Sequence, residues 1–177
     1  MSEYDWPMQF RAVYEAASGR YHKGERNPQK LFSKTELDFL GSIGCSAQEL
    51  FDFIDDGVRY GEPSFETTLL TTAVRREYFL VEQKGIPSST QVSMDALPAK
   101  RDEVDGIAWL PRLIEKARAK LRGEMPPDLM YGCGGDRPFL RSVNIELSEF
   151  LRVVWLAGND DRRIVEYVKN RRTKLRT

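Results

Sequence analysis

The turn Tyr131-Gly132-Cys133-Gly134-Gly135-Asp136 holds the most promising chemical groups of the chain, directly before a predicted short helix. A thiol at or just before a helix N-terminus meets unpaired backbone N–H groups and the positive end of the helix dipole, and both favour the thiolate. Cys133 and Asp136 are therefore the candidate catalytic residues, with Cys133 as the nucleophile. Gly134 and Gly135 allow positive φ and a close backbone approach, so the same turn could cradle a carboxylate or a phosphate.

Basic residues on both sides of this turn could supply the countercharge for a small anionic ligand. Arg137 follows the turn directly, and Lys116 and Arg118 lie on the predicted helix that precedes it. Tyr131 opens the turn itself. The candidate ligand-binding residues are therefore Lys116, Arg118, Tyr131, Gly134, Gly135 and Arg137.

A purely structural interpretation of the same residues stays open. Asp136 would cap the helix, Cys133 would be a small buried hydrophobe, and Lys116 and Arg118 would be solvated. Catalysis also usually needs a base near the thiol, and His22 is the only histidine. The sequence predicts a small-anion site at Cys133 whose catalytic status is undecided. The alternative function is a helical protein–protein interaction module with no enzymatic activity.

Composition excludes several other classes of protein. The chain has no run of about 18 apolar residues, and its N-terminus lacks the basic and apolar regions of a secretory signal, so we expect a cytoplasmic protein with no membrane span. Two distant cysteines and one histidine do not predict a zinc site, and we expect no metal and no cofactor. The sequence contains no basic stripe with interleaved aromatic residues, so we expect no nucleic-acid binding. The sequence indicates no particular oligomeric state.

The elements that must position these residues are predicted to be helices nearly throughout. Apolar residues recur at helical spacing in most segments, so we expect an all-α fold with at least six helices and at most a trivial amount of strand. We predict an N-terminal helical half over residues 1–85, a Ser/Thr/Pro-rich linker over 86–105 and a C-terminal helical half over 106–177. Two capping boxes, Ser33 to Glu36 and Ser46 to Glu49, mark helix starts, and Gly57 is predicted to end the second of these helices.

The two halves share a sequence pattern at a constant separation of 100 residues. Phe39-Leu40-Gly41-Ser42-Ile43 matches Phe139-Leu140-Arg141-Ser142-Val143, and Glu49 matches Glu149. The pattern favours a duplication covering residues 10–57 and 110–157, with two pseudo-symmetric repeats, although chance similarity between amphipathic helices explains it as well. Under the duplication, Ser33 corresponds to Cys133 and Glu36 to Asp136.

The second half carries two motifs that occur together in a known family. The helix contains Glu115-Lys116-Ala117-Arg118-Ala119, and the turn downstream contains Cys133-Gly134-Gly135-Asp136. This pairing resembles the bacterial family called domain of unknown function 5069, over about residues 106–170, with a fainter similarity over 10–57. The resemblance implies that Lys116, Arg118, Cys133 and Asp136 form one constellation, and it implies no particular activity.

Overall fold

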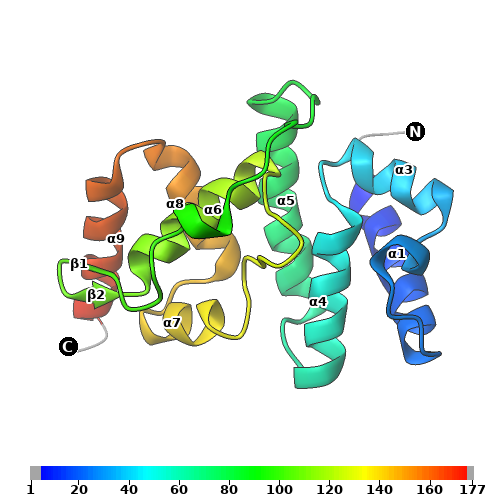
Figure 1. The fold of residues 1–177 in the computed structure, drawn as a ribbon, viewed down its shortest axis with the longest axis horizontal. Helices are drawn as coiled ribbons and strands as arrows, with labels where there is room; N and C mark the ends of the chain where they lie inside the picture. The colour runs from blue at the N-terminus through cyan, green and yellow to red at the C-terminus, as the bar shows by residue number, and fades with distance from the viewer. Residues whose placement is uncertain (1–4, 175–177) are drawn as a thin grey trace. The chain divides into compact units, whose positions relative to one another are not determined.

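The computed structural model describes residues 5–174, whose regular secondary structure is helical apart from one short hairpin (Figure 1). The chain divides into two units, Met1–Pro87 and Ser88–Thr177. The first unit contains α1 (Trp6–His22), α2 (Pro28–Leu31), α3 (Lys34–Ser42), α4 (Ala47–Tyr60) and α5 (Phe65–Val81). The second contains a 3₁₀ turn (Met94–Ala96), β1 (Glu103–Val104), β2 (Ile107–Ala108), α6 (Leu110–Arg122), α7 (Asp136–Ser142), α8 (Leu147–Ala157) and α9 (Asp161–Lys174). The all-α prediction is confirmed, with nine α-helices among these described residues.

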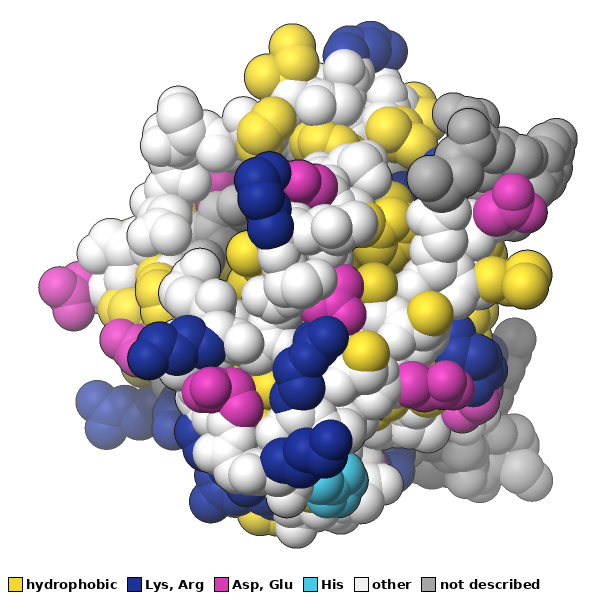
Figure 2. All heavy atoms as spheres, turned by 90° about the vertical axis from the view of Figure 1, so that its right-hand side faces the viewer, with side chains coloured by type: hydrophobic (Ala, Val, Ile, Leu, Met, Phe, Trp, Pro, Cys, Tyr) yellow, Lys and Arg dark blue, Asp and Glu magenta, His cyan; other side chains and the backbone are white. Residues whose placement is uncertain are grey.

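The first unit is built around α1, which packs against α2, α4 and α5. Both predicted capping boxes form, at the starts of α3 and α4. The prediction that α4 ends at Gly57 is wrong. The helix continues to Tyr60 and ends at Gly61, which takes the left-handed conformation with φ of 75°. Figure 2 faces this unit and shows hydrophobic side chains exposed in a recess between charged ones.

The second unit is built around α6, which packs against α8 and against the β1–β2 hairpin, while α9 packs against α8. The start of the segment predicted as a linker is attached to this unit by hydrogen bonds. Val92 N donates to the Glu124 carbonyl oxygen at 2.9 Å, and the Ser88 hydroxyl donates to the Glu124 carboxylate at 2.9 Å. The hairpin then leads directly into Trp109 and α6.

Residues 100 positions apart in the sequence have similar hydrogen bonds, helix packing and burial in the two units. The Leu40 carbonyl accepts hydrogen bonds from the amides of Ile43 and Cys45, and the Leu140 carbonyl accepts them from Val143 and Ile145. The long helix packs against the capped helix in each unit, α1 on α4 and α6 on α8. These matches support a duplication, which stays a prediction. The buried pairs are Phe10 and Leu110, Val13 and Leu113, Ala17 and Ala117, Leu40 and Leu140, Leu50 and Phe150, and Ile54 and Val154.

Between residues 5 and 174, the structure contains no helix with the length and apolar character that crossing a membrane requires. In the same range, no three or more His, Cys, Asp or Glu side chains gather closely enough to hold a metal ion.

Candidate functional site

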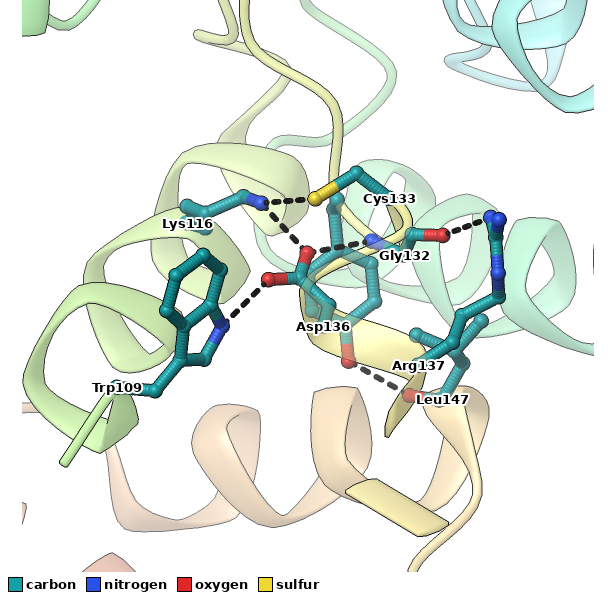
Figure 3. A network of polar contacts seen from close by, with 8 residues as sticks. Trp109, Lys116, Gly132, Cys133, Asp136, Arg137 and Leu147 are labelled. Carbon is teal, nitrogen blue, oxygen red and sulfur yellow. Dashed lines mark hydrogen bonds and ion pairs between the residues drawn. The ribbon is translucent and has the colours of Figure 1, made fainter. Parts of the chain in front are cut away.

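Lys116, Cys133 and Asp136 meet in the second unit, between α6 and the turn that precedes α7 (Figure 3). Lys116 Nζ lies 2.6 Å from Asp136 Oδ2 and 3.2 Å from Cys133 Sγ. The lysine and aspartate side chains are only 3% and 0% exposed, whereas Cys133 is partly exposed. The site therefore combines a buried ion pair with a partly solvent-exposed thiol.

The Asp136 carboxylate accepts hydrogen bonds on both of its oxygens. Trp109 Nε1 donates to Oδ1 at 2.9 Å, and the Gly132 amide donates to Oδ2 at 2.8 Å, beside the Lys116 ammonium (Figure 3). A buried carboxylate is stable only with such partners. Asp136 does not act as the helix cap that the structural interpretation assumed, because the residue before α7 is Gly135 and the carboxylate binds the turn upstream.

Trp109 is a member of the site that the sequence analysis did not include among the candidate residues. It takes a left-handed conformation with φ of 72°, which is unusual for a bulky residue and marks a locally imposed geometry. Its indole ring lies against Gly135, where a Cβ atom would come 2.7 Å from Cη2 and still closer to Cζ2. The glycine is therefore required by the approach of the ring.

The positive φ expected of Gly134 and Gly135 is not observed, whereas their predicted ligand-binding role stays a prediction. Gly132, with φ of 85°, is the left-handed residue of the turn, and Gly135 has φ of −93°. A Cβ atom on Gly134 would meet only Arg137 Nη2, at an ordinary contact distance of 3.9 Å. Neither Gly134 nor Gly135 is thus needed for a positive φ. Only Gly135 must lack a Cβ atom, because the Trp109 ring occupies that space.

Substituting the two glycines separately tests this difference. Gly135→Ala forces the indole ring away from Asp136, and we expect it to destabilise the second unit by about 1–3 kcal/mol, the usual cost of overpacking. Gly134→Ala is the matched control and should change stability by less than about 0.5 kcal/mol. Urea denaturation of both variants measures the difference. Equal stabilities would show that the ring does not lie on Gly135.

Arg137 and Tyr131 hold the turn in place. Arg137 is buried, and its Nη1 donates to the Gly132 carbonyl oxygen at 2.6 Å. The Tyr131 hydroxyl donates to the Leu147 carbonyl oxygen at 2.7 Å. Burial raises the pKa of the Tyr131 phenol well above its usual value, and the charge of Asp136 acts in the same direction, so the phenol stays neutral. Both side chains are near the site, but the Arg137 guanidinium and the Tyr131 hydroxyl donate hydrogen bonds to backbone carbonyl oxygens.

Arg118 does not join the other predicted residues. It forms an ion pair with Glu115 at 2.7 Å and another with Asp161, and its Nη2 donates to the Gly158 carbonyl oxygen at 2.9 Å. It therefore links α6 to the end of α8 and the start of α9. The physical reason is helix geometry, since side chains two positions apart, such as 116 and 118, point to different sides of a helix.

The first unit contains a related but more exposed ion pair. Arg20 on α1 binds Glu36 in the first turn of α3 through two hydrogen bonds, at 2.8 and 3.0 Å, with side chains 38% and 14% exposed. Although burial opposes the shift, hydrogen bonds from Arg20 and from Ser33 lower the pKa of Glu36. In each unit, an acidic residue in the first turn of a short helix, α3 or α7, thus binds a cation on the long helix before it, α1 or α6. Only the second unit buries the pair and places a thiol on it.

The comparisons with known proteins concern this second unit. The family model described as Domain of unknown function (DUF5069) matches residues 95–177, a range that contains every residue of the Cys133 site. No curated protein and no solved structure matches the chain. The resemblance noted in the C-terminal half is confirmed, while the fainter similarity over residues 10–57 stays a prediction. Residues 95–177, which are 83 of the 177 residues of the chain, are therefore similar to the DUF5069 family.

Proposed function

We propose that the second unit is a thiol-dependent site in which Cys133 acts as a nucleophile toward a small electrophile. The observation that carries the proposal is the 3.2 Å contact between Lys116 Nζ and the sulfur of the partly exposed Cys133. An ammonium group at this distance stabilises negative charge on sulfur, and the thiolate is the nucleophilic form of cysteine.

The buried ion pair fixes the position of this ammonium group. Asp136 holds Lys116 Nζ at 2.6 Å, and the carboxylate is itself held by Trp109 and the Gly132 amide. A charge positioned in this way needs no rearrangement when a charged sulfur forms beside it. Lys116 and Asp136 are therefore positioning residues, and Cys133 is the group that reacts.

The same contacts argue against a site that only binds an anion. Lys116 is already engaged by Asp136, Arg137 by the Gly132 carbonyl, and Arg118 by Glu115 and Asp161. The thiol is the partly exposed group that these contacts leave for a ligand. Since both cysteines are free, the proposal also fits the cytoplasmic location expected from the sequence, where thiols remain reduced.

Hydrogen peroxide is a suitable probe for this chemistry. The Cys133 thiolate attacks one peroxide oxygen, the O–O bond breaks, and the products are a sulfenic acid on Cys133 and hydroxide, so that sulfur is oxidised and peroxide reduced. Dimedone then traps the sulfenic acid as a stable adduct that mass spectrometry detects.

We expect one dimedone adduct per chain, on Cys133, after brief exposure to stoichiometric peroxide. Cys45 serves as the internal control, because it is buried with 5% exposure and should remain unmodified. The Cys133→Ser variant should give no adduct. An unmodified Cys133 under these conditions would contradict the proposal and would favour the interaction module with no chemistry.

A further inference from the structure

We propose that the first unit contains a second, independent binding site, a groove between α1, α3 and α5 that takes an organic anion with an apolar body. The groove has a volume of about 730 Å³ and lies entirely within this unit. This volume falls within the range typical of small-molecule pockets. The Cys133 site is in the other unit and plays no part in the argument.

The walls of the groove are mostly apolar. They are formed by the rings of Trp6 and Phe39 and by the aliphatic side chains of Val13, Ile43 and Leu80. Trp6 and Phe39 pack against the core of the unit but remain partly exposed. An open apolar surface of this kind favours a hydrophobic ligand body, because binding removes both surfaces from water.

One cation on the wall gives the groove its charge preference. Arg76 lies with its guanidinium carbon 5.2 Å from the centre of the Trp6 ring, and its buried Nε has no hydrogen-bond partner among residues 5–174. Glu36 also lines the groove, but its carboxylate is held by two hydrogen bonds from Arg20. Because the Nε of Arg76 is buried, a ligand in the groove would meet the terminal nitrogens of the guanidinium.

A carboxylate is the ligand group that best matches these donors. A guanidinium binds a carboxylate through two parallel N–H···O bonds, and such charge-assisted bonds are strong where water is partly excluded. The chemical class that fits is an amphipathic carboxylate, with its apolar chain along the Trp6 and Phe39 rings and its head group on Arg76.

Isothermal titration calorimetry of the full chain with sodium octanoate and with 1-octanol tests the proposal, since the two probes share a chain but only one is charged. We expect octanoate to bind at least about tenfold more tightly than octanol, the effect of one charge-assisted contact. Arg76→Gln should abolish this preference. Absence of octanoate binding, equal affinities, or a preference that survives Arg76→Gln would each overturn the proposal.

A second pair of variants locates the binding event. Ala12 lines the groove and is exposed on α1, so Ala12→Phe fills the groove without disturbing the core. Ala16 is an exposed alanine one turn further along α1, outside the groove, and Ala16→Phe is the matched control. Ala12→Phe should weaken octanoate binding at least about tenfold, and Ala16→Phe should leave it unchanged. Unchanged binding in Ala12→Phe would place the ligand elsewhere and contradict the assignment.

Discussion

Replacing Lys116 by methionine should destabilise the second unit by about 3–5 kcal/mol, the usual cost of leaving one member of a buried ion pair without its partner. The Asp136 carboxylate is fully buried, so water cannot replace the lost ammonium. The remaining donors, Trp109 Nε1 and the Gly132 amide, are neutral and compensate only in part. Urea denaturation measures the loss, and hydrogen exchange followed by mass spectrometry should locate it in α6 and α7.

The double variant Lys116→Met/Asp136→Asn separates charge from packing. It removes both charges and keeps an acceptor for Trp109, so it should recover most of the stability lost in the single variant. Lys34→Met is a control for the loss of a lysine in an exposed pair with Asp38, and it should leave stability nearly unchanged. If Lys116→Met is as harmless as Lys34→Met, the pair is not a buried ion pair.

Truncating the matched core residues of the two units is expected to have effects of similar size. Phe150 and Leu50 are both fully buried at positions 100 residues apart. Phe150→Ala should cost about 3–5 kcal/mol and Leu50→Ala about 2–5 kcal/mol, because each leaves a cavity in a packed core. Hydrogen exchange should rise in α6 and α8 for the first variant and in α1 and α4 for the second.

Exposed leucines on helices of the same two units provide the controls for this comparison. Leu156 is 64% exposed on α8 and Leu70 is 56% exposed on α5, and their replacement by alanine should have little effect. A Phe150→Ala variant as stable as Leu156→Ala would show that Phe150 is not in the core. It would also remove the main support for the duplication, which depends on matched positions being buried alike.

Local sequence patterns predicted the helices well because their causes are local. Ser33 with Glu36 and Ser46 with Glu49 form the expected capping boxes, whose groups are only three residues apart. The end of α4 was misplaced because Gly57 and Gly61 are both acceptable stop signals in sequence. Only Gly61 takes the left-handed conformation in the structure, at the position where the chain turns.

The Cys133 site was predicted in part. The spacing within the turn and the family motif indicated Lys116, Cys133 and Asp136, which do meet. The same reasoning could not separate Lys116 from Arg118, since the direction of each side chain depends on how α6 is rotated against its neighbours. The contact of Trp109 with Gly135 joins residues 26 positions apart and depends on an unusual backbone conformation, which no local pattern indicates.

The alkylation rate of Cys133 by iodoacetamide at neutral pH, measured with the lysine present and absent, tests the central claim most directly. The rate in the native chain should be at least about tenfold higher than in Lys116→Met/Asp136→Asn, because the double variant lacks the ammonium group that lies 3.2 Å from the reacting sulfur. Lys120→Met, which removes another buried lysine one turn along α6, is the matched control and should react within about twofold of the native chain. Equal rates in the native chain and the double variant would contradict the claim that Lys116 activates Cys133.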